Sequence, residues 1–184
     1  MPNYNGVWSL VTQYQYAADW SADNVSPATL AAGGGGGRAV FEIGVLSSIV
    51  NTMEFTTILT GSTFTDFGDA TVTSQARNSL SSDTRGVTGG GTNNTTNVMD
   101  YVTLASAGNS TDFGDLSRTK HNIMPAASVT RGIFAGGTGT GANEIEYITI
   151  ANTGNVTDFG DLVVDYKGAG GSCQSTTRAL FGGG

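Results

Sequence analysis

The pentapeptide Thr-Asp-Phe-Gly-Asp, the TDFGD motif, occurs three times, at residues 65–69, 111–115 and 157–161, so successive copies begin 46 residues apart. A motif that recurs at a fixed period of about 20–50 residues indicates one supersecondary unit copied along the chain. The chain is therefore expected to fold as an array of similar units. Repetition also lowers the expectation of catalysis, because an active site needs unlike residues that converge once.

The similarity extends beyond the motif. Runs of β-branched and aromatic residues precede each motif, at residues 51–59, 97–104 and 143–150, and turn-forming Gly and Asn residues follow them. Their alternation with period two predicts short β-strands joined by tight turns. Upstream of each run lies a further strand-like segment that begins with arginine and ends with glycine. These segments are residues 38–44, 85–91 and 131–137, and a fourth copy, residues 178–184, ends the given sequence.

A fourth unit is expected to be divided between the two ends of the chain. In the three clear units an aromatic residue lies 11 positions before the first aspartate of the motif. Trp8 and Asp19 keep this spacing, and Trp20 stands where the motif has phenylalanine. Residues 1–37 thus resemble a unit without its first strand, and 178–184 a first strand without its unit. We predict that these two ends pair and close a ring, because closure removes exposed sheet edges.

The predicted fold is all-β: a propeller-like ring of four repeats of about 46 residues. A single domain is expected over residues 1–184, since a chain of this length buries roughly 70% of its unfolded surface in one core. The five glycines at 33–37 are interpreted as a connector, because a phosphate-binding loop would end in Lys-Ser/Thr. The four units are 38–84, 85–130, 131–177, and 178–184 plus 1–37.

Charge and composition exclude several function classes. The formal net charge is −7, and the eight basic residues are spread singly, so no basic stripe is available for nucleic acid or an anionic membrane. No run reaches the ~18 apolar residues of a membrane span. Cys173 is the only cysteine, which excludes an intrachain disulfide and a cysteine-based zinc site. A packing role is expected for Cys173, in a chain made in a reducing cytoplasm.

Four arginines open the four units: Arg38, Arg85, Arg131 and Arg178. The last aspartate of each motif precedes the next of these arginines by 16 or 17 residues. Guanidinium and carboxylate groups form bidentate pairs. We therefore predict that the arginine of one unit pairs with a motif carboxylate of a neighbouring unit.

Other motifs suggest chemistry but favour structural interpretations. Asp-Phe-Gly is the magnesium-binding tripeptide of kinases, yet the other kinase motifs are missing, and a turn with a core-filling Phe is favoured. Residues 137–141 imitate a dinucleotide loop but are interpreted as a hairpin turn. His121, the only histidine, has no matched nucleophile and is expected in a turn or at the surface. Calcium remains an alternative for the acidic pairs Asp66/Asp69, Asp112/Asp115 and Asp158/Asp161, which alone supply too few oxygen ligands.

The units at 85–91, 97–104 and 108–116 resemble the glycine-rich repeats of virion structural proteins of tailed bacteriophages, particularly those of marine bacteria. Residues 6–10, followed by 13–15 and Trp20, are similar to a segment of the same kind of protein. The paired glycines and following aromatic strand also resemble kelch propeller blades, although the gap between aromatic residues is longer here.

This resemblance implies a non-enzymatic structural or binding component of a phage particle: a tail fibre or spike, a head fibre, or a decoration protein. It implies synthesis in the host cytoplasm, location in the virion, and assembly as a homo-oligomer with other virion proteins. A host surface glycan is a further candidate partner. No catalytic, metal-binding or cofactor-binding residue is transferred, and the binding residues stay unassigned.

Two alternatives belong to other classes. Rims rich in Gly, Asn, Thr and aromatic residues suit a carbohydrate-binding module that recognises host glycans. A glycan-cleaving propeller enzyme would need two unlike carboxylates facing one site. The non-repeated acids Glu42, Asp83 and Asp165 are scattered in sequence and offer no such pair.

Overall fold

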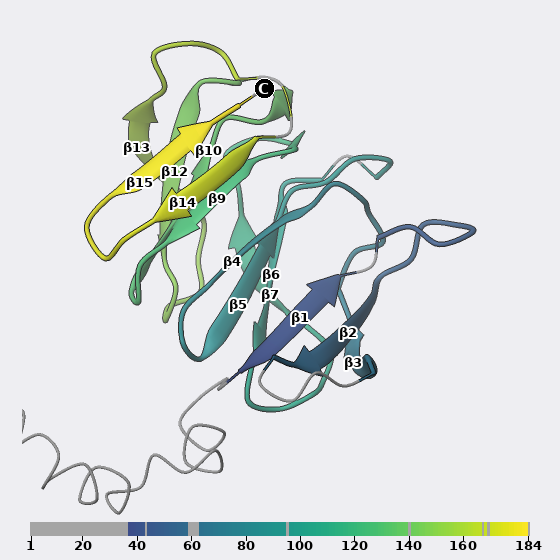
Figure 1. Cartoon of the computed structure of the whole chain (residues 1–184). Helices are drawn as coiled ribbons and strands as arrows, with labels where there is room; N and C mark the ends of the chain where they lie inside the picture. The colour runs from purple at the N-terminus through teal and green to yellow at the C-terminus, as the bar shows by residue number, and fades with distance from the viewer. Residues whose placement is uncertain are drawn as a thin grey trace, which may run out of the picture.

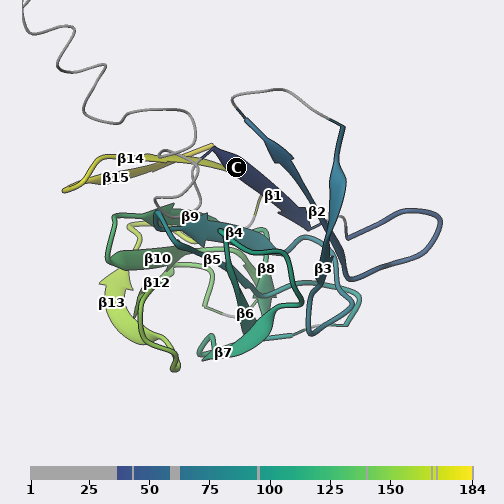
Figure 2. The same cartoon turned by 90° about the horizontal axis from the view of Figure 1, so that it is seen from below.

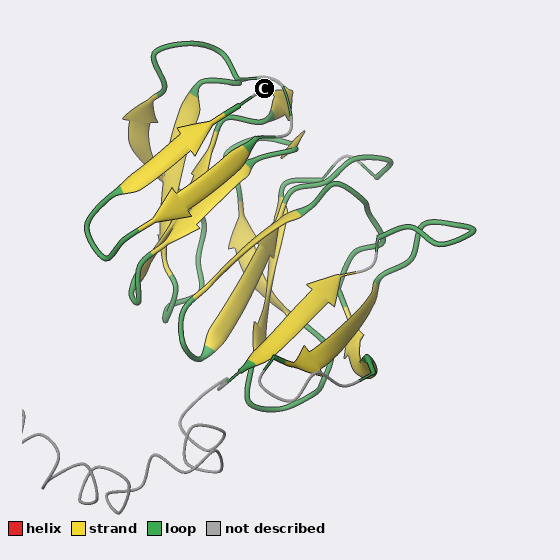
Figure 3. Ribbon diagram, in the orientation of Figure 1, coloured by secondary structure: helices red, strands yellow, loops and turns green. Residues whose placement is uncertain are grey.

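We analysed the chain in a computed structural model, which describes residues 37–42, 44–58, 63–94, 96–139, 141–166, 168 and 170–183. Over these residues the chain is all-β, with strands and loops and no helix (Figure 3). The all-β prediction is therefore confirmed. No helix in this part of the chain could cross a membrane.

Antiparallel sheets follow one another along the chain (Figure 1). Sheet I has the order β1-β2-β3, sheet II β4-β5-β6-β7, and sheet III β13-β12-β10-β9; β14-β15 and β8-β11 are two-stranded. The strands are β1 (Arg38–Glu42), β2 (Thr52–Thr57), β3 (Thr65–Asp69), β4 (Asn78–Ser81), β5 (Arg85–Gly89), β6 (Val98–Thr103), β7 (Thr111–Asp115), β8 (Lys120–His121), β9 (Met124–Ala127), β10 (Arg131–Ala135), β11 (Thr138–Gly139), β12 (Glu144–Thr149), β13 (Thr157–Asp161), β14 (Gly171–Gln174) and β15 (Ala179–Gly182).

The predicted strands are present, but the sheets that contain Arg85, Arg131 and Arg178 each begin seven residues before that arginine. β4 pairs with β5 and β9 pairs with β10, so the strand that precedes an arginine joins the sheet of that arginine. β14 and β15 form the corresponding pair at the C-terminal end. Each full sheet is thus a four-stranded meander whose first strand lies just upstream of the unit boundaries written from the sequence.

The TDFGD motif forms a strand with a β-bulge, so its interpretation as a turn is wrong. In each sheet the pairing shifts by one residue, as between Met53 and Glu54, which pair with Gly68 and Asp66 and leave Phe67 as the extra residue. The same shift occurs opposite Phe113 and Phe159. A bulge of this kind needs an unusual backbone conformation, and the motif glycines have φ values of +132° to +139°.

The hydrophobic core lies between sheets II and III. Val87, Met99, Phe113, Phe134 and Ile148 are among its buried members. The first strands of successive sheets come together, since β9 lies beside both β4 and β14 (Figures 1 and 2). Successive sheets are therefore stacked face to face, with their first strands next to one another on one side of the stack.

The predicted ring closure falls mainly on residues outside the described part. Trp8, Asp19, Trp20 and residues 33–36 of the glycine run all lie there. The described residues by themselves form no closed ring, and β15 pairs with β14.

Candidate functional site

The repeated feature of this structure is the junction between one sheet and the next, where the TDFGD strand binds a loop of the following unit. At the first junction, between sheets I and II, Gly108 N donates to Phe67 O at 2.7 Å and Ser110 N donates to Asp69 O at 2.8 Å. Asp69 N donates in turn to Asn109 Oδ1 at 3.0 Å. Three hydrogen bonds thus join the motif strand to residues 108–110.

The second junction, between sheets II and III, repeats this pattern 46 residues later. Gly154 N donates to Phe113 O at 2.6 Å, and Val156 N donates to Asp115 O at 3.0 Å. Asp115 N donates to Asn155 Oδ1 at 3.0 Å. The motif is therefore a docking strand for the next unit, a role that its sequence alone did not reveal.

The motif glycine is required by this contact as well as by its backbone angle. A Cβ on Gly68 would lie 2.5 Å from the carbonyl of Gly108, and one on Gly114 would lie 2.4 Å from the carbonyl oxygen of Gly154. These are backbone atoms of the docked loop and have little freedom to move. By contrast, a Cβ on Gly108 or Gly154 meets nothing within 4 Å.

The unit-opening arginines do reach the neighbouring unit, but they bind main-chain carbonyl groups there, so the predicted ion pair is wrong. Arg38 Nη1 donates to Leu104 O at 3.0 Å, and Arg85 Nη1 donates to Ile150 O at 2.9 Å and Ala151 O at 3.0 Å. Each guanidinium lies over an aromatic ring of its own sheet, 4.2 Å from the centroid for Arg85 on Tyr101. The motif carboxylates lie on the bulged strand and take no part in this contact.

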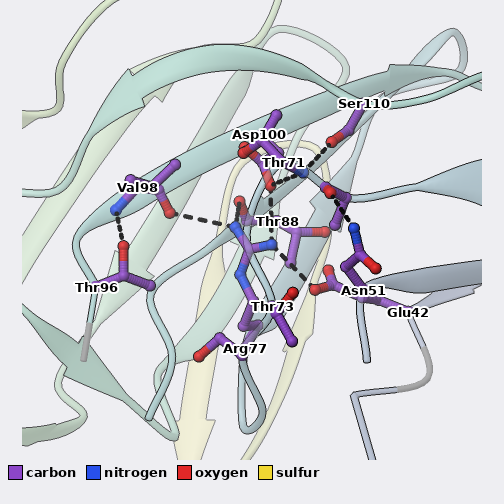
Figure 4. A network of polar contacts seen from close by, with 12 residues as sticks. Glu42, Asn51, Thr71, Thr73, Arg77, Thr88, Thr96, Val98, Asp100 and Ser110 are labelled. Carbon is purple, nitrogen blue, oxygen red and sulfur yellow. Dashed lines mark hydrogen bonds and ion pairs between the residues drawn. The ribbon is translucent and has the colours of Figure 1, made fainter. Parts of the chain in front are cut away.

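Arg77 is the buried ionic centre of the first junction (Figure 4). Its Nη1 lies 3.0 Å from Glu42 of sheet I and 2.9 Å from Asp100 of sheet II, with all three side chains at most 9% exposed. Its Nε donates to Gly90 O at 2.9 Å. Asp100 also accepts hydrogen bonds from the main-chain N–H and the hydroxyl of Thr71. One cation thus joins both sheets and the loop between them.

Burial raises the pKa of the Glu42 carboxyl above its ordinary value of 4.5, and the charge of Arg77 opposes that rise. The position of Glu42 corresponds to Gly89 and Ala135 in the other units, so this acid belongs to the first junction alone. Its side chain is engaged by Arg77 in a structural contact. It is therefore unsuited to the role of a catalytic carboxylate.

Lys120 takes the central place at the second junction. Its Nζ is fully buried, 2.6 Å from Glu146 and 3.6 Å from Glu144. Ser117 N donates to Glu146 Oε1 at 2.9 Å, as Thr71 N does to Asp100 46 residues earlier. Arg118, half exposed, also pairs with Glu144 at 2.8 Å.

The two cations occupy different positions of the repeat. Lys120 corresponds to Ser74, which is buried, whereas Arg77 corresponds to Ile123, which is also buried. At one repeat position the first junction has the cation Arg77 and the second has the neutral Ile123. At the other position the first junction has the neutral Ser74 and the second has the cation Lys120. Aligning the units would have revealed this exchange beside the acids Asp100 and Glu146, and it is the signal that sequence reasoning missed.

The third motif has the same local geometry without a docked neighbour in the described part of the chain. Tyr147 and Phe159 are 5.9 Å apart in an edge-to-face contact, close to the 6.0 Å between Tyr101 and Phe113. Phe159 is nevertheless 51% exposed, whereas Phe113 is 2% exposed. A Cβ on Gly160 would meet nothing within 4 Å.

The remaining predicted residues lie away from these contacts or outside the described part. His121 is half-buried in β8, which pairs with β11. Residues 137–139 lie in the connection between the antiparallel strands β10 and β12, but Thr138 and Gly139 form β11 there and pair with β8, so the predicted simple hairpin turn is not what this connection forms. Cys173 is exposed on β14, so its predicted packing role is wrong. In the ranges described, no three His, Cys, Asp or Glu side chains gather as a metal site, and the calcium alternative gains no support.

A cavity of about 270 Å³ lies between sheets I and II. Val40, Met53 and Leu80 contribute apolar side chains to its lining, and Arg38 and Tyr101 contribute polar groups. A second cavity of about 510 Å³, with Glu42, Arg77 and Thr88 in its lining, lies next to the same junction.

Neither a comparison with protein-family models nor a search of the curated proteins finds a match to this chain.

Proposed function

We propose that the chain is a propeller-like, non-enzymatic structural and binding component of a phage particle. The observation that carries this proposal is the repeated junction. At each of the two junctions a buried cation, Arg77 or Lys120, lies with its acidic partners between the sheets and holds the units together. These buried charged side chains thus serve assembly of the array, as expected of a scaffold that presents loops.

The propeller-like ring is the architectural part of this proposal. Four-stranded meanders at a period of 46 residues, with β4, β9 and β14 lying side by side, are the arrangement expected around a central axis. A compact ring of 184 residues has an expected radius of gyration of roughly 16 Å. Small-angle scattering tests this value, and a clearly larger radius for the monomer would contradict closure.

The proposed location of this chain in a phage particle is tested by the protein composition of purified particles. Particles made by the genome that encodes this chain should contain it in many copies, as tail fibre or spike, head fibre or decoration protein, measured by mass spectrometry of purified virions. Immunogold labelling then separates head from tail. Absence of the chain from washed particles would contradict the proposal.

Binding of a host surface glycan is a second candidate, favoured by the cavity beside Tyr101. Aromatic and hydroxyl groups together suit a sugar ring, and Ser79, Ser81 and Thr88 lie in the same lining. A glycan array with the full chain tests this function. Ser81→Phe should abolish binding by filling the cavity, whereas Ser106→Phe, outside the lining, should leave it unchanged. Retained binding by Ser81→Phe would exclude this site.

A further inference from the structure

The third motif presents, at the end of the series of sheets, the surface that the first two motifs bury. Phe67 and Phe113 are each 2% exposed beneath the docked unit, whereas Phe159 is 51% exposed. Leu162 is half-buried, although its counterpart Leu116 is 1% exposed. Arg131 lies 4.5 Å from the centroid of Tyr147, as its counterparts lie over their rings, but it is exposed and binds no carbonyl in the described part.

We propose that residues 7–20 of the same chain dock on the third motif, as residues 100–113 dock on the first and 146–159 on the second. This inference rests on the ring of the proposed function and replaces its general strand pairing with a specific contact. The correspondence is set by Trp8 and Trp20, which hold the places of Tyr101 and Phe113.

The main-chain contacts of the earlier junctions carry over to this segment. Residues 15–17 correspond to 108–110, whose backbone binds the first motif. Gln15 falls at the position of Gly108, where a Cβ meets nothing within 4 Å, so a side chain is tolerated there. Val11 falls at the position of Leu104, whose carbonyl binds Arg38. The carbonyl of Val11 would therefore receive Arg131.

The side chains on the two surfaces change together at the third junction. At the first two junctions the N–H of Thr71 or Ser117 donates to the acid of the next unit, Asp100 or Glu146. The corresponding positions of the third junction hold Val163 and Val7. Val163 is fully exposed in the absence of a neighbour. Val163 keeps a main-chain N–H but has no hydroxyl to donate to an acid, as Thr71 does to Asp100, whereas Val7 would bury both apolar side chains.

The third junction has neutral residues at both repeat positions that hold a cation at the earlier junctions. Tyr166 occupies the repeat position of Lys120. Without an acid at position 7 there is no carboxylate for a cation to neutralise, so the neutral Tyr166 agrees with Val7. The exposed surface of the third motif therefore suits an apolar segment that has two aromatic residues at the spacing of Tyr101 and Phe113. Residues 7–20 have these properties and are already tethered to the molecule.

Cross-linking of the full chain tests this contact. In a Cys173→Ser background, Tyr16→Cys with Asp161→Cys forms the test pair, since Asn155 Oδ1 contacts Asp115 N at the corresponding positions. Asn155→Cys with Asp115→Cys is the positive control, and Thr29→Cys with Asp161→Cys is the control for chance encounter. A short bismaleimide is applied at micromolar protein, well below the effective concentration on the order of mM within one molecule.

We expect the test pair to cross-link within one molecule with a yield like that of the positive control and well above that of the Thr29 pair. Adding Val163→Asp should lower the yield, because docking would bury the new carboxylate. If nothing docks there, Val163 stays fully exposed and the substitution should leave the yield unchanged. Covalent dimers would show that a second molecule occupies the surface and would overturn the proposal. An unreacted test pair beside a reacted positive control would overturn it too. Neither result bears on whether the chain is found in phage particles.

Discussion

The second and third TDFGD motifs have the same sequence and the same local fold, but they differ in what covers them. Both form a bulged strand with a positive-φ glycine and an edge-to-face aromatic pair. Phe113 is buried under residues 154–156, whereas Phe159 is half exposed. The motif therefore specifies its own conformation, and burial of its phenylalanine depends on the next unit. Stability in such an array belongs to the junctions as much as to the sheets.

The largest effect is expected at the buried cations of the first two junctions. Arg77→Met leaves Glu42 and Asp100 buried without their cation, which should lower the free energy of unfolding by about 3–5 kcal/mol. Lys120→Met should have a similar effect through Glu146. Urea denaturation measures both. Arg118→Met, at a half-exposed side chain, is the control; an equal loss there would show that the buried pairs are not special.

The next largest effect on stability is expected from Gly68, which is packed against backbone atoms, compared with Gly108, which faces open space. Gly68→Ala places a Cβ 2.5 Å from the Gly108 carbonyl at a φ of +139°, so we expect a loss of about 2–3 kcal/mol in unfolding free energy. Gly108→Ala, on the other side of the same contact, has open space and should stay within ~0.5 kcal/mol. Thermal unfolding compares the two variants. Equal stabilities would mean that the strand and loop do not touch as described.

The arginine contact across the junction is a smaller contribution. Arg85→Met removes hydrogen bonds to two carbonyl groups and the stacking on Tyr101, and it should cost about 1–2 kcal/mol. Arg85→Lys retains the charge but lacks the planar fork, so most of the loss should remain. Full rescue by lysine in urea titrations would argue for a purely electrostatic role.

The smallest effect is the pH dependence contributed by Glu42. Burial raises the pKa of this carboxyl above 4.5, so the folded chain binds more protons than the unfolded chain just above pH 4.5. Its contribution to stability should therefore fall as the pH rises through that window, by at most about 1.4 kcal/mol per unit of pKa rise. Glu42→Gln should remove this slope in unfolding titrations between pH 4.5 and 7. A steeper fall in the variant would contradict the assignment.

Periodicity allowed the strands and the all-β class to be predicted from sequence, because alternating β-branched residues between Gly and Asn turns leave few other solutions. Strands β6 and β12 lie within the predicted runs 97–104 and 143–150. The sequence of the motif indicates a turn because Asp and Gly favour turns locally. In the structure, pairing with β2, β6 and β12 overrides that preference and leaves a bulge.

The junction could be predicted only in part. The spacing of the arginines correctly indicated contact between neighbouring units, but their partners are carbonyl groups, which every residue carries and no sequence pattern marks. The cations Arg77 and Lys120 sit at different repeat positions, so a search for identical residues passes over them. Aligning the units shows that two positions have exchanged a cation for a neutral residue, and the contacts of Arg77 with Asp100 and of Lys120 with Glu146 show that both cations serve the same purpose.

The most direct test of the account compares Phe159→Ala with Phe113→Ala in the full chain by urea denaturation. If residues 7–20 cover the third motif, both variants should lose about 3–5 kcal/mol of unfolding free energy, the usual cost of a buried phenylalanine. A large loss for Phe113→Ala beside an unchanged Phe159→Ala would show that the third motif stays uncovered, and would contradict the closed array of junctions.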